Sequence, residues 1–341
     1  MKIILLEKNL EDKYENFLLK HSESLVYYSI KFKEFLKEVL DCEEEYLLAI
    51  ENNEIRGVLP LMKRRGKYGY VYNSLPFYGS NGGIIADNKE AFSYLINQYN
   101  NLIENSNIGS AVIISNPLYN REYYSSIRYD IIDERIGQFT ELSFNNDAET
   151  ELMSKIDSSA RRNVKKAFKI GIKVEIDNTQ FEFLKKTHYD NMKAINGKAK
   201  PQKFFNLVTK YFEEGKDYNL YVALLDGKPI AGLLLFYYNK IVEYYIPAIV
   251  QEFRSYQPLA LIIYQAMVDA FKKGYDLWNW GGTWLTQEGV YRFKKKWGAK
   301  EIEYFYYIKI NNKDIYTSTK EEIQKEYDNF FVIPFDKLKN G

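Results

Sequence analysis

Two runs of apolar residues, each folded back on itself by a polar turn, divide the chain into similar halves. Residues 46–50 and 55–61 flank the turn 51–54, and residues 220–225 and 230–235 flank the turn 226–229. Short apolar runs around such turns are typical of β-hairpins. The second strand of each hairpin also begins with an Ile-x-Gly triplet. This duplication at about half the chain length predicts two domains of like architecture.

Apolar residues at helical spacing predict helices at 31–40, 90–104 and 259–272, and short apolar runs predict strands at 111–114 and 276–280. Hairpins give antiparallel pairs, whereas a helical crossover gives a parallel pair. We therefore expect an α/β protein of the α+β kind, with mixed sheets. The polar run at 145–147 marks a boundary, which gives an N-terminal domain of residues 1–145 and a C-terminal domain of residues 146–341.

Composition narrows the class of protein. Of the 341 residues, 46% are hydrophobic and 27% are charged, which is typical of a soluble globular protein. No apolar run is long enough to span a bilayer, and no signal peptide is recognisable, so we expect a cytoplasmic protein. The single cysteine excludes an intramolecular disulfide. The two histidines are too few and too isolated for a metal site or a Ser-His-Asp triad, so we predict neither. The net charge of +1 predicts no duplex DNA partner.

Five basic residues and no acidic one lie between Arg161 and Lys169. The spacing predicts one helix, ended by Gly171, whose apolar face carries Ile156, Ala160, Val164, Ala167 and Phe168. Arg161 and Lys165 border that face. A basic helix is usually just solvated, and the alternative is a phosphate-binding helix.

The segment 276–299 combines a strand, two glycines and a short basic helix. Gly281 and Gly282 are expected to interrupt the strand, and Thr286 can cap the helix that follows. Val290, Phe293 and Trp297 share its apolar face, and Gly298 ends it. Arg292 and Lys294 to Lys296 occupy the other faces. Such a segment can hold an anionic or polarised group, although core phenylalanines and solvated lysines are the simpler interpretation.

A loop rich in proline and glycine, SLPFYGSNGG at 74–83, marks either a site or a crossing between strands.

Three segments together resemble FemABX-type transferases, double GNAT-fold enzymes that attach amino acids to cell-wall precursors. They are FKKKWGA after the glycine pair, SARRNVKKA, and the SLPF…GG loop. The resemblance implies two tandem GNAT-like domains, the N-terminal one on the acceptor side and the C-terminal one on the donor side. It implies a catalytic pair, Phe293 and Lys294. Several members of the family also carry a precursor-contacting lysine in the first domain, and here the sequence departs from them, because Lys31 and Lys33 lie nearby but neither aligns with that lysine. The implied substrate-binding residues are Arg161, which would contact phosphates, Lys165, Pro76, Phe77, Tyr78, Gly82, Gly83, Trp280, Gly281, Gly282 and Tyr291.

The donor follows from another loop. Residues 251–258 stand where a GNAT domain cradles the pyrophosphate of coenzyme A, yet they contain no glycine. Side chains there obstruct close backbone approach, so a donor other than coenzyme A is expected. The resemblance to FemABX-type enzymes implies that this donor is aminoacyl-tRNA, and no other cofactor is expected. The segment 181–215 is too short for the helical hairpin that bridge-forming members of the family carry.

Three functions remain open. The first is transfer of an aminoacyl group from aminoacyl-tRNA to an amine of a cell-wall (peptidoglycan) or surface-polysaccharide precursor. That precursor would be UDP- or lipid-linked, which allows peripheral contact with the inner membrane. The second is N-acylation of a sugar precursor from acyl-CoA or acyl-carrier protein. The third is a non-catalytic GNAT-like binding module. The amino acid, the acceptor and the oligomeric state are left open.

Overall fold

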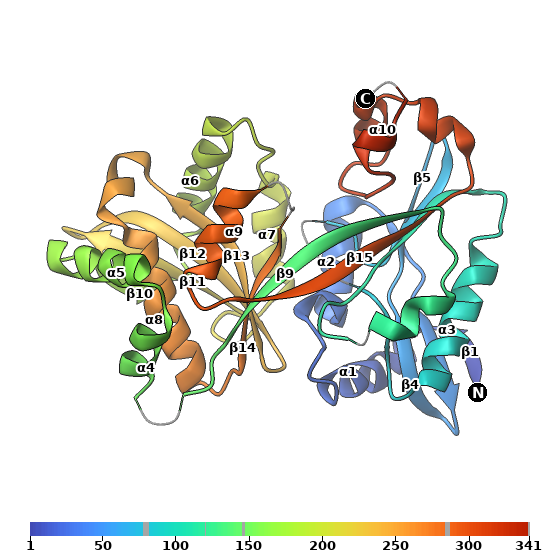
Figure 1. Ribbon diagram of the computed structural model, residues 1–341, viewed down its shortest axis with the longest axis horizontal. Coiled ribbons are helices and arrows are strands. Elements are labelled where there is room, and N and C mark those ends of the chain that lie inside the picture. The colour runs from blue at the N-terminus through green and yellow to red at the C-terminus, as the bar shows by residue number, and fades with distance from the viewer. Residues whose placement is uncertain (78–81, 120, 145–146, 284–286, 340–341) are drawn as a thin grey trace. The chain divides into compact units, whose positions relative to one another are not determined.

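The computed structural model describes residues 1–77, 82–119, 121–144, 147–283 and 287–339 (Figure 1). The chain forms two compact units: unit 1 is Met1–Ile136 with Ile302–Gly341, and unit 2 is Gly137–Glu301. Strands β9 (Ile131–Glu141) and β15 (Lys300–Ile310) contribute residues to both units. Each unit combines antiparallel hairpins with a parallel strand pair, which confirms the predicted α/β class with mixed sheets.

Unit 1 contains two groups of strands. One sheet has the order β1 (Lys2–Leu5), β3 (Leu47–Glu51), β4 (Glu54–Leu59) and β7 (Ile85–Ala86). The other group has the order β15, β8 (Ile108–Ile114), β6 (Gly69–Asn73), β5 (Met62–Gly66) and β2 (Glu43–Glu44). Strands β3 and β4 form the predicted hairpin, with Leu47 opposite Leu59. Strands β6 and β8 are parallel.

Each α-helix of unit 1 carries buried apolar residues, as do some of the 3-10 helices of this unit. The helices are α1 (Glu11–Leu19), α2 (Ile30–Leu40), α3 (Lys89–Leu102), α10 (Lys320–Glu326) and the 3-10 helices η1 (Lys8–Leu10), η2 (Val26–Tyr28), η3 (Arg121–Ser126), η5 (Lys313–Thr317) and η6 (Phe335–Lys337). Ser29 and Asn88 begin α2 and α3 by accepting hydrogen bonds from backbone N–H groups. Both predicted helices are confirmed.

Unit 2 is built on the strand order β10 (Lys173–Ile176), β11 (Tyr218–Leu225), β12 (Lys228–Tyr238), β13 (Ile241–Ile249), β14 (Leu277–Thr283) and β9. Strands β11 and β12 form the second predicted hairpin. Strands β13 and β14 are parallel, and their pairing runs only from Ile241 opposite Leu277 to Glu243 opposite Asn279. Beyond that pair no further ladder between the two strands is described, and this end of the strand pair is called the fork below.

Helices cover both faces of the unit 2 sheet (Figure 1). Helices α4 (Ala148–Lys155), α5 (Ser158–Ile170) and α8 (Pro258–Lys272) share a core with Trp278 and Trp280. Helices α6 (Phe181–Ala194) and α7 (Gln202–Tyr211) pack on the opposite face, where Leu184 meets Gly232 and Phe212 meets Phe236. Helix α9 (Glu288–Lys295) follows β14, and η4 (Gln251–Tyr256) precedes α8. None of the helices in the described ranges is long and apolar enough to cross a bilayer.

The compact units differ from the predicted domain boundaries at the C-terminus. The segment from Ile302 onward lies in unit 1, whereas the prediction assigned residues 146–341 to the second domain. The reason is long-range pairing: Tyr306 of β15 lies opposite Ile114 of β8. The Tyr327 hydroxyl also donates to the Gly69 carbonyl at 2.9 Å and accepts from the Tyr68 N–H at 2.8 Å.

The predicted basic helix is interrupted near its start. Helix α4 ends at Lys155, Ile156 is extended between the two helices, and α5 begins at Ser158. Asp157 causes this restart because its carboxylate accepts the Ser159 N–H at 2.7 Å. The placement of Phe168 on the buried face was wrong, since its side chain is 73% exposed. Gly171 does end the helix, with a positive φ of 89°.

The glycine pair does not end its strand, as the sequence had suggested. Strand β14 continues through both glycines to Thr283. Gly281 has a φ of +74°, a conformation that side chains disfavour, which explains the glycine without a strand break. Val290 is 45% exposed and therefore outside the core, whereas Trp297 is buried and Gly298 ends the segment with a φ of +74°. Thr286 lies outside the described residues.

Candidate active site

Lys294 is the centre of the candidate site in unit 2. It lies on α9, yet its side chain is only 5% exposed. The ammonium donates to the Thr283 hydroxyl at 2.8 Å and to the carbonyls of Gly282 and Gly281 at 3.1 and 3.2 Å. These bonds use all three donors of a lysine. Burial lowers the pKa of Lys294 from 10.5 to about 8, while hydrogen bonds to oxygen favour the charged form. The ammonium is thus the main form at neutral pH.

A buried hydrogen-bond chain fixes the position of this ammonium. Thr283 accepts from Lys294 and donates to the side-chain carbonyl of Gln138 at 3.1 Å. The Gln138 amide in turn donates to the Tyr291 carbonyl at 3.2 Å, and Gln138 is fully buried. These hydrogen bonds therefore link β9, β14 and α9 around the Lys294 ammonium. A site held this way is preorganised, which is what electrostatic catalysis requires.

The backbone beside Lys294 is open on one side. A Cβ atom added at Gly281 would meet no atom of the described residues within 4 Å. The Gly281 N–H donates to the Asn279 side-chain oxygen at 2.8 Å, while the Asn279 amide nitrogen has no hydrogen-bond partner in the described part of the chain. Asn279 and the buried carboxylate of Glu243 face each other as the last described pair of β13 and β14. Two buried polar residues therefore lie at the start of the fork, followed by the contacting rings of Tyr244 and Trp280.

Aromatic rings support the other side of β14. Trp280 is 3% exposed, and its indole N–H donates to the Thr140 hydroxyl at 2.9 Å. Phe293 meets Trp280 edge to face at 6.0 Å between ring centroids. Tyr291 is half-buried, and its hydroxyl contacts Glu301 and Lys295. The structure brings Trp280, Phe293 and Tyr291 together around β14 and α9, where Trp280 and Phe293 act as packing residues.

Arg161 and Lys165 occupy α5 in the same unit. The Arg161 guanidinium donates through Nη1 to the carbonyls of Ile156 at 2.6 Å and Met153 at 3.2 Å, so it binds the end of α4. Its other N–H groups make no hydrogen bond to the residues the structure describes. Lys165 is exposed. The start of α5 is joined to the end of α9, where the Asp157 N–H donates to the Lys296 carbonyl at 2.8 Å. No hydrogen bond within the described ranges joins Arg161 to Lys294.

The predicted loop residues belong to unit 1. Pro76 and Phe77 have buried side chains, and Phe77 has a φ of +82°, which is strained for a bulky residue. Gly82 and Gly83 are packed so closely that a side chain at Gly83 would lie 2.2 Å from the hydroxyl of Tyr124. Tyr78 lies outside the described residues. Strained backbone of this kind gathers at functional sites, and the binding role of the loop stays a prediction.

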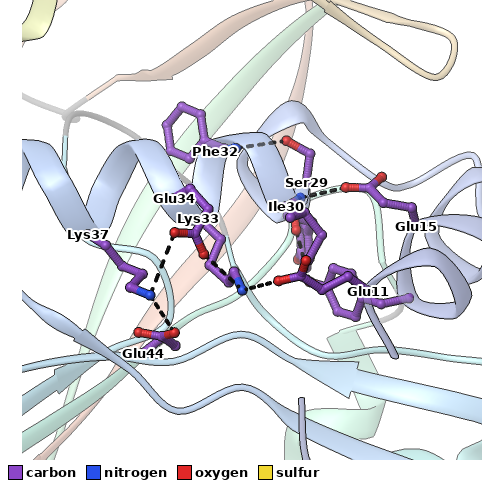
Figure 2. A network of polar contacts seen from close by, with 11 residues as sticks. Glu11, Glu15, Ser29, Ile30, Phe32, Lys33, Glu34, Lys37 and Glu44 are labelled. Carbon is purple, nitrogen blue, oxygen red and sulfur yellow. Dashed lines mark hydrogen bonds and ion pairs between the residues drawn. The ribbon is translucent and has the colours of Figure 1, made fainter. Parts of the chain in front are cut away.

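Lys33 does not fit the role of a precursor-contacting lysine. Its side chain on α2 is 5% exposed, and its ammonium pairs with Glu11 at 2.7 Å and Glu34 at 3.0 Å (Figure 2). Lys37 extends the network to Glu44 at 2.7 Å. A buried lysine paired with two carboxylates has a structural role, because moving its ammonium to a ligand would leave those carboxylates unpaired.

The sequence did not single out four polar residues. Thr283 and Gln138 belong to the hydrogen-bond chain of Lys294, and Asn279 and Glu243 form the last pair of β13 and β14. Asn279 stands between two tryptophans, and Glu243 stands between Val242 and Tyr244. A polar residue inside such an apolar strand is the signal that identifies these two. Gln138 and Thr283 carry no such mark, because only the fold brings β9 beside β14.

Comparison with protein families gives a match within unit 2. Residues 154–295 match the family model described as acetyltransferase (GNAT) domain. These residues cover most of unit 2, including α5, the fork, β14 and α9. This part of the chain is therefore similar to a GNAT acetyltransferase domain. Comparison with curated protein sequences gave no match.

Solved structures extend the similarity to both units. FemX is 16% identical with a TM-score of 0.73, over 93% of this chain and 99% of FemX. L-PGS from Bacillus licheniformis is 9% identical with a TM-score of 0.52, over 84% of this chain and 92% of that one. A tandem GNAT protein from the clavulanic acid biosynthesis pathway is 7% identical with a TM-score of 0.52, over 91% and 98%. The predicted tandem GNAT fold and its resemblance to FemABX-type proteins are thereby confirmed at the level of the fold.

Proposed function

We propose that this chain transfers an aminoacyl group from aminoacyl-tRNA to an amine of a peptidoglycan or surface-polysaccharide precursor. The fold it shares with FemX over nearly the whole chain supports this proposal, as does the fold it shares with L-PGS. In the reaction, the acceptor nitrogen attacks the ester carbonyl of the donor. A C–N bond forms, the C–O bond to the terminal ribose breaks, and the amine proton leaves with the ribose oxygen.

The observation that carries the proposal is the buried ammonium of Lys294 beside an open glycine backbone. Negative charge develops on the carbonyl oxygen of the ester during attack. A cation held in a buried site stabilises that charge more in the transition state than in the ground state. The contacts to Gly281 and Gly282 are longer than the 2.8 Å contact to Thr283. We infer that the Lys294 ammonium exchanges one of these longer hydrogen bonds for one to the carbonyl oxygen of the substrate. Its hydrogen bond to Thr283 stays in place and holds the ammonium in position.

The start of α8 favours a donor other than coenzyme A. A pyrophosphate cradle needs free backbone N–H groups at a helix N-terminus. Pro258 at the first position has no N–H, and the Ala260 N–H is already bonded to the Gln257 carbonyl at 3.1 Å. Gln257 itself precedes the helix with a φ of +64°. Few donors remain for a diphosphate at this position.

A donor panel tests the proposal. The purified chain is incubated with UDP-linked and lipid-linked amine acceptors and either labelled aminoacyl-tRNAs or labelled acyl-CoA and acyl-carrier protein. We expect label to reach the acceptor from aminoacyl-tRNA and to form an amide that survives mild base, which cleaves the donor ester. Transfer only from the thioester donors would replace the proposal by N-acylation of a sugar precursor. Transfer from no donor would leave a binding module.

A further inference from the structure

The outer face of α5 carries a stripe of cations, of which only Lys165 is a predicted substrate contact. Arg162, Lys165, Lys166 and Lys169 are all exposed, and their spacing puts them on one side of the 13-residue helix. The stripe is about 10 Å long at 1.5 Å per residue. On its flank, one position before Lys169, the ring of Phe168 is 73% exposed. We name these five residues the α5 face.

The cations of the α5 face differ from those near α9 in their surroundings. Near α9, Arg292 pairs with Glu288 at 2.7 Å, and Lys295 pairs with Glu301 at 3.3 Å. No carboxylate in the described part of the chain pairs with any cation of the α5 face. A favourable interaction with the helix dipole accounts for Lys169 in the last turn, but not for Arg162 in the first half or for the exposed ring. No described carboxylate therefore compensates the positive charge of this face.

We propose that the α5 face binds the RNA of the donor, with its cations on successive phosphates and Phe168 stacked on an unpaired base or a ribose. A nucleic-acid strand presents one phosphate about every 3.4 Å along its axis, so the stripe can meet about three. An exposed aromatic ring among cations matches the way proteins bind single-stranded RNA. This inference rests on the proposed function, because it takes tRNA as the donor.

An anionic membrane fits this face less well. A helix that lies in a membrane surface inserts a continuous apolar face among the lipids. The apolar face of α5, formed by Ala160, Val164 and Ala167, is already buried against the core of unit 2, next to α8 (Figure 1). Only the ring of Phe168 would be available to enter the lipid.

Binding of uncharged tRNA, measured by fluorescence anisotropy over a range of salt concentrations, tests the proposal without requiring turnover. One triple variant is Arg162→Gln, Lys166→Gln and Lys169→Gln. Its matched control is Lys2→Gln, Lys8→Gln and Lys20→Gln, which removes the same charge from exposed positions of unit 1. Lys165 is left unchanged because it is a predicted acceptor contact. A separate Phe168→Ala variant removes the ring alone.

We expect the α5 triple variant to lower the slope of log Kd against log salt by about 2 to 3, at roughly 0.7–0.9 per phosphate. The control should keep the wild-type slope. Phe168→Ala should weaken binding roughly 5- to 150-fold, the usual loss for one stacked base, without changing the slope. Equal losses in the two triple variants, or no tRNA binding by the wild-type chain, would overturn the proposal.

Two further outcomes separate this inference from its alternatives. Phosphatidylglycerol vesicles that bind through the α5 face, while tRNA does not, would overturn it in favour of a membrane contact. If tRNA binds through the α5 face but no aminoacyl group is ever transferred, the proposed function fails and the RNA surface stands. If transfer occurs and is unaffected by the α5 triple variant at limiting tRNA, the surface fails and the proposed function stands.

Discussion

Replacing Lys294 by methionine separates a catalytic cation from a structural one. Methionine keeps the unbranched stem and removes the ammonium, so the packing around Thr283 changes little. Thr283 keeps its bond to Gln138, and the glycine carbonyls, which belong to half-exposed residues, can turn to water. The substitution therefore leaves no buried polar group without a partner, which is the usual cause of a large loss of stability.

The expected change in stability can be worked out from the pKa. A lowering from 10.5 to about 8 means that burial disfavours the charged form by about 3 kcal/mol, at 1.4 kcal/mol per unit. Methionine removes that cost. We expect the free energy of unfolding at pH 7, measured with urea, to be unchanged or up to about 3 kcal/mol higher than in the wild type. A protein that needs Lys294 to fold would lose stability instead.

The expected change in activity goes the other way. Loss of one preorganised electrostatic group usually lowers kcat by about 10²–10³-fold. The measurement is single-turnover transfer from labelled aminoacyl-tRNA. Lys296→Met is the matched control, because Lys296 ends the same helix but is exposed, and it should keep turnover near the wild-type value. Full activity of Lys294→Met, equal loss in both variants, or unfolding of Lys294→Met would refute the reasoning.

Three further predictions concern pH, Arg161 and Gly83. Because Lys294 loses its proton near pH 8, transfer should decline above that pH in a rate profile. The pKa of Lys294 in the folded chain lies below its value of 10.5 in the unfolded chain, so the unfolded chain binds more protons between about pH 8 and 10.5. The free energy of unfolding should therefore rise with pH over that range, and Lys294→Met should show neither the decline in transfer nor this rise. Arg161→Ala should cost about 1–3 kcal/mol in urea unfolding and raise the acceptor KM, and an unchanged KM would remove Arg161 from the site. Gly83→Ala should cost about 1–3 kcal/mol because its new methyl group would meet Tyr124, and wild-type stability would contradict the packing.

The sequence by itself determined the elements whose signals are local. Both hairpins, with their apolar runs and short polar turns, form where the pattern indicated, as do α2, α3 and α8. Gly171 and Gly298 end their segments because a positive φ is a local requirement that glycine meets. The importance of Lys294 came from a resemblance between segments, since an isolated lysine triplet reads as a solvated surface.

The tertiary structure decided what depends on distant neighbours. No local signal assigns the segment after Ile302 to unit 1, because its partners lie far earlier in the sequence. Tyr306 pairs with Ile114, and the hydrogen bond from Tyr327 to Gly69 joins residues 258 positions apart. Periodicity could not show that Asp157 restarts the basic helix, or that the side chain of Phe168 is exposed. It also could not show that Lys294 is buried, because its burial and its lowered pKa arise where β9, β14 and α9 meet.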